Sequence, residues 1–249
     1  MPTPKNIPPG DRLIVPLDVP DFDRARDLVL TLGSSVMFYK IGLELLLSAG
    51  GGYSRMVDWL LEQRKKVMLD VKIFDIARTT AAAIRQLTGQ GVTFVTVHGT
   101  DEILRAAVEV KNGVKVLAVT VLTSFDQKDL EDLGFPAGVS VERVVLSRAR
   151  RALEIGCDGV ISSGLEAEEL RRSLGESFLI VVPGVRPGVN REEAYRDDQK
   201  RVVDVEEAFE KGADYIVVGR PILRAANPRA AAEEIQQRIA AFFARAETI

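Results

Sequence analysis

The sequence predicts a single-domain (β/α)8 barrel, a TIM barrel of the α/β class, on two observations. Eight short apolar, β-branched runs alternate with about eight helix-like segments along the chain, and that number closes such a barrel. The length of 249 residues also suits one α/β barrel. An open doubly wound sheet is the alternative, but no Gly-x-Gly-x-x-Gly motif follows the first apolar run.

The strand candidates are continuously apolar, which is typical of strands buried on both faces of a sheet. In chain order they are residues 13–17, 37–41, 67–71, 94–97, 116–121, 159–161, 178–182 and 215–218. Helices are expected over residues 23–32, 79–89, 102–110, 141–155 and 166–174. Asp21 or Asp23 and Ser140 are suitable N-caps. Gly33 and Gly156 stand where helices should end.

Composition excludes several classes of protein. The net charge of −3 is spread over interspersed acids and bases, so the chain lacks the basic face that nucleic-acid binding needs. No apolar run approaches a membrane span, so no membrane contact is expected. Residues 1–11 are Pro-rich and predict a flexible tail before a barrel domain over 12–249. Cys157 is the only cysteine, which fits a reducing, cytoplasmic location.

Polar residues follow the predicted strands, where the chemistry of a (β/α)8 barrel collects. They are Asp18, Lys40, Asp70, Lys72, Asp75, His98, Thr123, Ser124, Arg186 and Arg220, which follows Gly219. The opposite ends of the strands carry no comparable series. By contrast, two charged runs are expected on solvated helix faces. These runs are Arg148, Arg150 and Arg151, and Glu166, Glu168 and Glu169.

Asp70 and Lys72 are two positions apart in the third strand. In a regular strand they would face the same side, about 6–7 Å apart. A carboxylate and an ammonium among apolar neighbours must be paired or functional. A buried ion pair would explain these two charges alone, but Lys40 and Asp75 are expected at the same mouth. Four charges of alternating sign indicate a preorganised electrostatic site.

The last two strands predict a phosphate site. Gly219 and Arg220 follow the eighth strand and Arg186 follows the seventh, and barrels of this kind often bind phosphate in those two loops. Glycine lets backbone N–H groups approach an oxyanion, and arginine offers a planar fork of donors.

The residues argue against a metal site. His98 is the only histidine, so a histidine-based metal cluster is impossible, and a supporting role beside Lys72 is preferred for it. Asp18 and Asp70 could hold magnesium, but the Lys40 ammonium would compete with a cation. A triad of Ser124, His98 and Asp70 lacks the nucleophile elbow that would support it.

The order of these residues resembles the orotidine 5′-monophosphate decarboxylase family. Residues 69–76, Leu-Asp-Val-Lys-Ile-Phe-Asp-Ile, match its D-x-K-x-x-D-I signature. Further matches over about residues 12–245 are Leu17-Asp18-Val19, Tyr39-Lys40-Ile41-Gly42, Leu122-Thr123-Ser124, Pro183-Gly184-Val185-Arg186-Pro187, Asp198-Gln199 and Val218-Gly219-Arg220-Pro221-Ile222. The family has histidine before the second Asp and Asp-Ile-Pro-Asn-Thr from it, so Phe74, Ala77 and Arg78 depart from the pattern.

The resemblance implies a homodimeric barrel that converts orotidine 5′-monophosphate to UMP and CO2 in de novo pyrimidine biosynthesis, without metal or cofactor. It implies that Lys72 donates the proton, Asp70 lies near the substrate carboxylate, Lys40 contacts the ribose and holds Asp70, and Asp18 binds the ribose. Asp75 and Thr79 would complete the neighbouring subunit's site, and Thr123 or Ser124 would contact the pyrimidine edge. The phosphate and its closing loop would be held by Arg186, Gln199, Gly219 and Arg220.

Two alternatives remain open. A magnesium-dependent sugar-phosphate decarboxylase or aldolase of the same superfamily looks similar on the third and eighth strands, but carries an acid where this chain has Lys40. The other alternative is a non-catalytic sensor of a phosphorylated ligand on an inherited barrel. The complete set of charged residues argues against the sensor, and turnover would exclude it.

Overall fold

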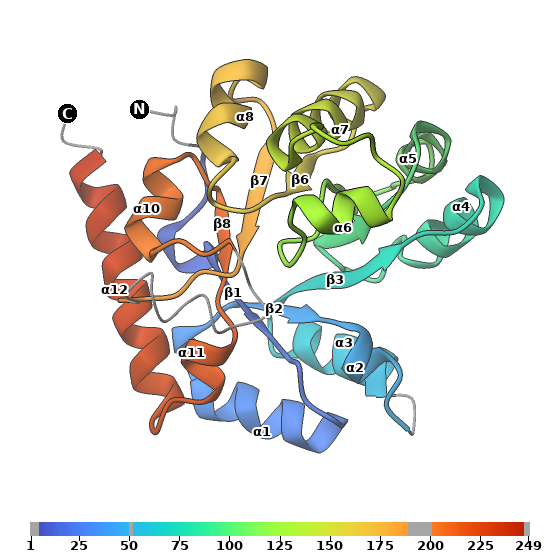
Figure 1. The fold of residues 1–249 in the computed structure, drawn as a ribbon. Helices are drawn as coiled ribbons and strands as arrows, with labels where there is room; N and C mark the ends of the chain where they lie inside the picture. The colour runs from blue at the N-terminus through green and yellow to red at the C-terminus, as the bar shows by residue number, and fades with distance from the viewer. Residues whose placement is uncertain (1–4, 50–51, 189–200, 247–249) are drawn as a thin grey trace.

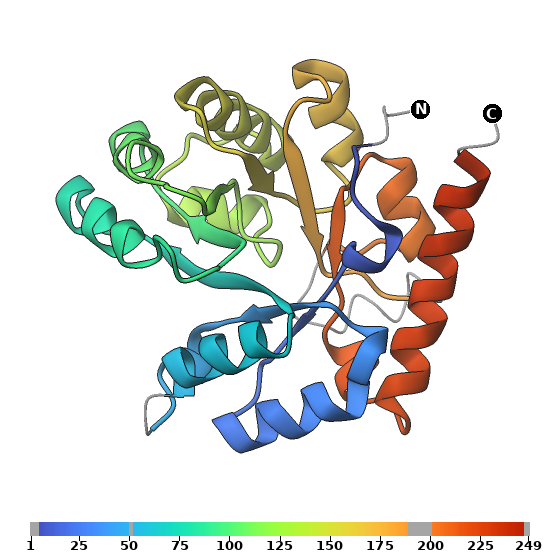
Figure 2. The same cartoon turned by 180° about the vertical axis from the view of Figure 1, so that it is seen from behind.

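The computed structural model describes residues 5–49, 52–188 and 201–246. Its centre is a closed barrel of eight parallel strands, which confirms the predicted fold (Figures 1 and 2). The strands are β1 (Leu13–Pro16), β2 (Phe38–Ile41), β3 (Lys66–Ile73), β4 (Phe94–Val97), β5 (Lys115–Val119), β6 (Gly159–Ile161), β7 (Leu179–Pro183) and β8 (Tyr215–Val217). Each strand pairs with the next, and β8 closes the barrel on β1.

Helices surround the barrel, and α12 packs on the outside against α1, α10 and α11 (Figure 1). They are α1 (Phe22–Leu32), α2 (Leu43–Leu46), α3 (Gly52–Glu62), α4 (Ala77–Gln86), α5 (Asp101–Val108), α6 (Gln127–Asp132), α7 (Val141–Ile155), α8 (Ala167–Leu174), α10 (Val205–Glu210), α11 (Arg220–Leu223) and α12 (Pro228–Ala246), with short 3-10 turns η1 (Pro9–Asp11) and η2 (Gly33–Ser35). No helix in the described ranges is long and apolar enough to cross a membrane.

The structure contains helix caps at residues that the sequence predicted. Asp21 accepts a hydrogen bond from the backbone N–H of Arg24, and Ser140 accepts one from that of Arg143. Helix α7 ends at Gly156, whose φ of 103° is in the left-handed region that favours glycine. These contacts satisfy backbone groups that the first and last turns leave without a helical partner.

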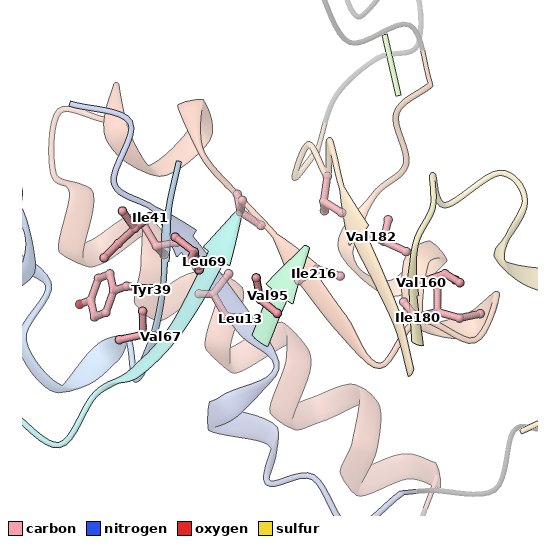
Figure 3. Packing of buried hydrophobic residues seen from close by; sticks show 14 of the residues in the cluster. Leu13, Tyr39, Ile41, Val67, Leu69, Val95, Val160, Ile180, Val182 and Ile216 are labelled. Carbon is pink, nitrogen blue, oxygen red and sulfur yellow. The ribbon is translucent and has the colours of Figure 1, made fainter. Parts of the chain in front are cut away.

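Alternation along the strands divides the apolar core into two layers. Leu13, Tyr39 and Ile216 point outward and pack under the helices with residues such as Val67 and Val182 (Figure 3). The inward layer fills the barrel itself, as expected for a packed interior rather than a pore.

Aromatic side chains fill the amino-terminal half of the barrel interior. Phe38, Phe94 and Tyr215 begin their strands, and their ring centroids are 5.1 to 5.8 Å apart. These three rings form the floor of the barrel interior. Above this floor, space for a ligand lies toward the carboxyl ends of the strands.

The described part of the expected N-terminal tail packs against this floor. The Lys5 ammonium is 2.6 Å from the Asp214 carboxylate, and Lys66 is 2.7 Å from Asp11. Ile7 packs against the interior cluster. Residues 5–11 therefore cover the end of the barrel opposite the predicted site.

Candidate active site

A cavity of about 830 Å³ opens at the carboxyl ends of the strands. Its lining includes the following residues predicted from sequence: Asp18, Lys40, Asp70, Lys72, Thr123, Ser124, Arg186, Gly219 and Arg220. These nine residues come from the ends of six strands or the loops that follow them, and the closed barrel brings them to one mouth. Asp75 and Thr79 are not among the lining residues, and Gln199 is outside the described part of the chain.

Charges of alternating sign form a continuous chain along one wall of this cavity. Lys40 Nζ is 3.2 Å from Asp18 Oδ1 and 3.3 Å from Asp70 Oδ2. Lys72 Nζ is 2.9 Å from Asp70 Oδ1. The side chains of Lys40 and Asp70 are 12% and 13% exposed, whereas that of Lys72 is 37% exposed. Lys72 is therefore the lysine with the more accessible ammonium.

The neighbouring charges hold Lys40 and Asp70 in their ionised forms. Burial disfavours charge on Lys40, but the carboxylates of Asp70 and Asp18 outweigh burial and raise the pKa of Lys40. Burial likewise disfavours charge on Asp70, but Lys40 and Lys72 outweigh it and lower the pKa of Asp70. A buried carboxylate is thus kept ionised at neutral pH by the two cations that flank it.

The backbone between Asp70 and Lys72 corrects the expectation of a regular strand. The register of β3 against β4 shifts between Leu69 and Ile73, and Lys72 has a φ of 48°. The Lys72 N–H donates to Thr96 Oγ1 at 2.9 Å. The bulge bends the strand and re-aims its side chains, so the two charges meet in an ion pair rather than standing at the regular spacing.

Two glycines of the matched motifs leave room that a side chain would fill. A Cβ at Gly42 would lie 3.1 Å from Lys40 Nζ and 3.2 Å from Asp18 Oδ1. A Cβ at Gly219 would lie 3.0 Å from Pro16 Cγ. Glycine at 42 therefore leaves the Lys40–Asp18 pair undisturbed, and glycine at 219 permits a close approach of backbone N–H groups.

Arg186 is placed by a short parallel bridge that begins the connection after β7. Val185 pairs with Val203, and the Arg186 N–H donates to the Val203 carbonyl at 3.0 Å. The Gly188 N–H also lies 3.4 Å from Asp204 Oδ1. These contacts fix both ends of the connection, while Gln199 lies outside the described residues.

A buried ion pair supports the loop that carries Thr123 and Ser124. Arg201 Nη1 is 2.5 Å from Glu166 Oε1, and Arg201 Nη2 donates to the Leu122 carbonyl at 2.8 Å. Glu166 is only 3% exposed. The expectation that Glu166 lies on a solvated helix face is therefore wrong, because it stands at the start of α8 and turns inward toward Ser163 and Arg201.

His98 is not among the residues that line the cavity. Arg148 Nη1 is 3.4 Å from His98 Nε2 and donates to the Thr120 carbonyl at 2.6 Å. The expectation that Arg148 lies on a solvated helix face is therefore wrong. The Phe74 ring packs edge-on against the imidazole. Burial, Arg148 and Lys72 together lower the pKa of His98, so the ring is neutral at pH 7.

Asp75 and Thr79 do not join the charged chain within one subunit. Both are exposed, and neither is among the residues that line the cavity. Asp75 Oδ1 instead accepts a hydrogen bond from the Ile76 N–H at 2.7 Å. Phe74 and Ile76, on either side of Asp75, are each 66% exposed.

The Lys40 ammonium lies between the two carboxylates that could have shared a magnesium ion. Its distances of 3.2 Å to Asp18 and 3.3 Å to Asp70 place a cation of the protein itself at that position. Within the described residues, no group of three or more His, Cys, Asp or Glu side chains is arranged to hold a metal.

Several residues at the mouth were not predicted from sequence. Arg24 and Arg224 line the cavity from α1 and from the end of α11, and Met68 forms part of its base. Thr96 lies beneath the Asp70–Lys72 pair. Residues two positions apart in a strand face the same side, and Phe94 faces the barrel interior. This spacing is the sequence signal that could have predicted an inward-facing Thr96.

The fold and this site define a (β/α)8-barrel enzyme that acts on a small anionic substrate at its carboxyl-terminal mouth. The chain belongs to the orotidine 5′-phosphate decarboxylase / HUMPS family, whose sequence model matches residues 11–235.

Individual proteins agree with this assignment. The chain is 54% identical over 240 residues to an orotidine 5′-phosphate decarboxylase of Methylococcus capsulatus, covering 96% of each chain. It is 46% identical over 232 residues to one of Nitrobacter winogradskyi, covering 92% of this chain and 93% of that one. A crystal structure of orotidine 5′-phosphate decarboxylase from Lactobacillus acidophilus superposes with a TM-score of 0.78 at 32% identity, covering 92% of this chain and 99% of the other.

Proposed function

We propose that the protein decarboxylates orotidine 5′-monophosphate to UMP and CO2 in pyrimidine biosynthesis, without a metal or an organic cofactor. The observation that carries the proposal is the chain Asp18–Lys40–Asp70–Lys72 at the barrel mouth, with contacts of 2.9 to 3.3 Å. The names of the relatives with 54% and 46% identity support the substrate and the reaction.

The chemistry requires a stabilised carbanion. When the bond to the carboxylate breaks, its electron pair remains on the pyrimidine carbon, and CO2 leaves. The Lys72 ammonium, which is the more accessible of the two, stabilises this charge and then transfers a proton from Nζ to the carbon. The reaction thus consumes one proton and needs no oxidant or second substrate.

Asp70 has the complementary task of opposing the substrate carboxylate. Its own carboxylate is kept ionised by Lys40 and Lys72, so a substrate carboxylate beside it is repelled. That repulsion disappears as neutral CO2 forms, which lowers the barrier relative to the bound substrate. Lys40 also prevents Asp70 from turning away, because it holds Oδ2 from the other side.

The remaining lining residues bind the rest of the nucleotide. Asp18 and Lys40 contact the ribose, and Thr123 or Ser124 contacts the pyrimidine edge. Arg186 and Arg220 lie in the loops after β7 and β8 and bind the phosphate with backbone N–H groups near Gly219. Gln199 completes the phosphate loop in this proposal and lies outside the described residues. Binding energy from the distant phosphate assists the chemical step.

We further propose a homodimer in which Asp75 and Thr79 complete the neighbouring subunit's site. The support is their exposed position next to Phe74 and Ile76, large apolar side chains that are each 66% exposed. Leu43 and Leu47 add apolar exposure of 52% and 80% around α2. Exposed apolar groups that gather beside a site mark an interaction surface.

We place the enzyme in the cytoplasm. The support is Cys157, the only cysteine, which is buried. Burial raises the pKa of its thiol to about 12, so it remains protonated and unreactive. No disulfide can form within the chain.

The test is the loss of orotate absorbance when the purified protein meets orotidine 5′-monophosphate in the presence of EDTA. We expect a rapid decrease with UMP as the product. Activity on a ketose or keto-acid sugar phosphate with magnesium, and none on the nucleotide, would instead assign the magnesium-dependent branch of the family. No turnover with either substrate would leave the binding function of a sensor.

A further inference from the structure

Thr96 connects the two charged residues of β3 through a single hydroxyl group. Its Oγ1 accepts a hydrogen bond from the Lys72 N–H at 2.9 Å and donates one to Asp70 Oδ1 at 3.0 Å. Thr96 has no exposed surface and is not among the cavity-lining residues. It therefore touches the residues proposed to act on the substrate, but not the substrate itself.

The hydroxyl takes the place of a missing partner in the sheet. Leu69 pairs with Val95 and Ile73 with Val97, so the three residues from 70 to 72 face only Thr96 on β4. The Lys72 N–H is held by the Thr96 side chain within this bulge. Lys72 also has a φ of 48°, which a residue with a Cβ adopts only when its surroundings hold it there.

The same hydroxyl restricts the carboxylate. Asp70 Oδ2 faces Lys40, and Asp70 Oδ1 faces both Lys72 and Thr96. A neutral donor at Oδ1 fixes the rotation of the carboxylate in a plane that serves both lysines. It also supports the ionised form without adding a positive charge that would attract the substrate carboxylate.

We propose that Thr96 is a positioning residue for the decarboxylation, acting through the backbone of Lys72 and the carboxylate of Asp70. This inference rests on the proposed function. Without the hydroxyl, Lys72 can relax toward a regular strand and withdraw its ammonium from the cavity. The effect should fall on the chemical step more than on binding, because phosphate and ribose contacts lie elsewhere in the mouth.

Two pairs of variants isolate the hydroxyl oxygen. Wild type and Thr96→Val have nearly the same shape, and Thr96→Ser and Thr96→Ala differ by the oxygen alone. We expect kcat for orotidine 5′-monophosphate to fall about 10- to 100-fold on losing the oxygen in each pair, as for a hydrogen bond to a charged group. KM should change by less than about threefold, and Thr96→Ser should keep most of the wild-type kcat.

A matched control is Thr120→Val. Thr120 is also buried, at 1% exposure, and its hydroxyl donates to the Ile161 carbonyl at 2.8 Å. This variant should lose a comparable amount of stability but keep kcat within about twofold, because its hydroxyl contacts neither charge. Melting temperatures of all variants separate loss of fold from loss of turnover.

The pH profile gives a second readout that a merely structural role would not move. Asp70 faces Lys40 of β2, Lys72 of its own strand and Thr96 of β4, with Asp18 and His98 the next titratable groups around them. Removing the donor raises the pKa of Asp70. The acidic limb of kcat/KM should therefore move to higher pH in Thr96→Val and stay in place in Thr96→Ser.

The outcomes are distinguishable. Equal kcat within both pairs, or an equal loss in Thr120→Val, overturns the role of Thr96. Loss of the fold in both oxygen-free variants also overturns it, because Thr96 would then be a structural residue. Wild-type protein without activity on the nucleotide overturns the proposed function itself.

Discussion

At the scale of single residues, the two lysines of the chain Asp18–Lys40–Asp70–Lys72 differ in what surrounds them. Lys40 lies between two carboxylates and is 12% exposed, whereas Lys72 is 37% exposed and, among the described residues, forms an ion pair with Asp70 only. An ammonium has three N–H donors. Lys72 can therefore keep its contact with Asp70 and still present a proton to a ligand, while Lys40 serves to hold the carboxylates.

His98 offers a pH dependence that can be assigned to one residue, because it is the only histidine of the chain. Burial, Arg148 and Lys72 lower its pKa below the ordinary value of 6.5. Between the folded and unfolded pKa values, the unfolded chain binds more protons, so acid favours unfolding. We expect the melting temperature of the wild type to fall as the pH drops below about 6.5.

The His98→Gln variant is the comparison for that measurement. Its melting temperature should change less than that of the wild type between pH 7 and the range where carboxylates begin to titrate. An identical pH dependence in the two proteins would show that burial, Arg148 and Lys72 do not lower the pKa of His98 in the folded protein.

At the scale of elements, continuously apolar runs were enough to predict the barrel. The predicted strands 94–97 and 159–161 coincide with β4 and β6, because a strand covered on both faces must be apolar throughout. The bulge in β3 could not be predicted in this way. The bulge contains a hydrogen bond that the Lys72 N–H donates to Thr96 Oγ1 on the next strand, and a contact of this kind leaves no trace in the periodicity of β3.

Most residues at the mouth could be predicted because the carboxyl ends of parallel strands converge whatever their order in the sequence. Glu166 and Arg148 could not, because helix periodicity alone places charged residues on a solvated face. Glu166 is buried beside Arg201 from a distant segment. Arg148 is only partly buried, and its guanidinium donates to the Thr120 carbonyl.

The capping of α10 provides a prediction at this scale. Asp204 is the N-cap in a capping box with Glu207, and its carboxylate also pairs with Arg238 of α12 at 2.8 Å. Asp204→Ala should lower the free energy of unfolding by about 1–2 kcal/mol. Chemical denaturation at neutral pH measures this difference.

Asp21→Ala is the matched control for that variant. Asp21 caps α1 with a hydrogen bond to the Arg24 N–H, in an exposed position. Its loss should be smaller, about 0.5–1 kcal/mol. Equal losses in the two variants would mean that the contact with α12 adds nothing to the cap.

At the scale of the whole molecule, the proposed homodimer would divide each site between two subunits. Asp75 is exposed and outside the cavity lining, and Phe74 and Ile76 beside it are each 66% exposed. A second subunit would cover these apolar side chains and bring Asp75 to a neighbouring mouth.

The Ile76→Asp variant tests this arrangement. A charge in an apolar interface should convert the dimer to a monomer and lower kcat/KM by at least about tenfold, because each site loses its partner's residues. Leu30→Asp, on the outer face of α1 at 60% exposure, should leave both properties unchanged. Light scattering and steady-state rates measure the two effects, and a fully active monomer would contradict the shared site.

The most direct test of the central claim is the Lys72→Ala variant, assayed for turnover of orotidine 5′-monophosphate and for binding of UMP. Because Lys72 supplies both the stabilising charge and the proton, we expect turnover to fall by at least about 1,000-fold. Affinity for UMP should change by less than about tenfold, since product binding does not use the proton. Lys111→Ala, which removes an ion pair with Asp158 at the opposite end of the barrel, serves as the control. Near-normal turnover in Lys72→Ala would contradict the account.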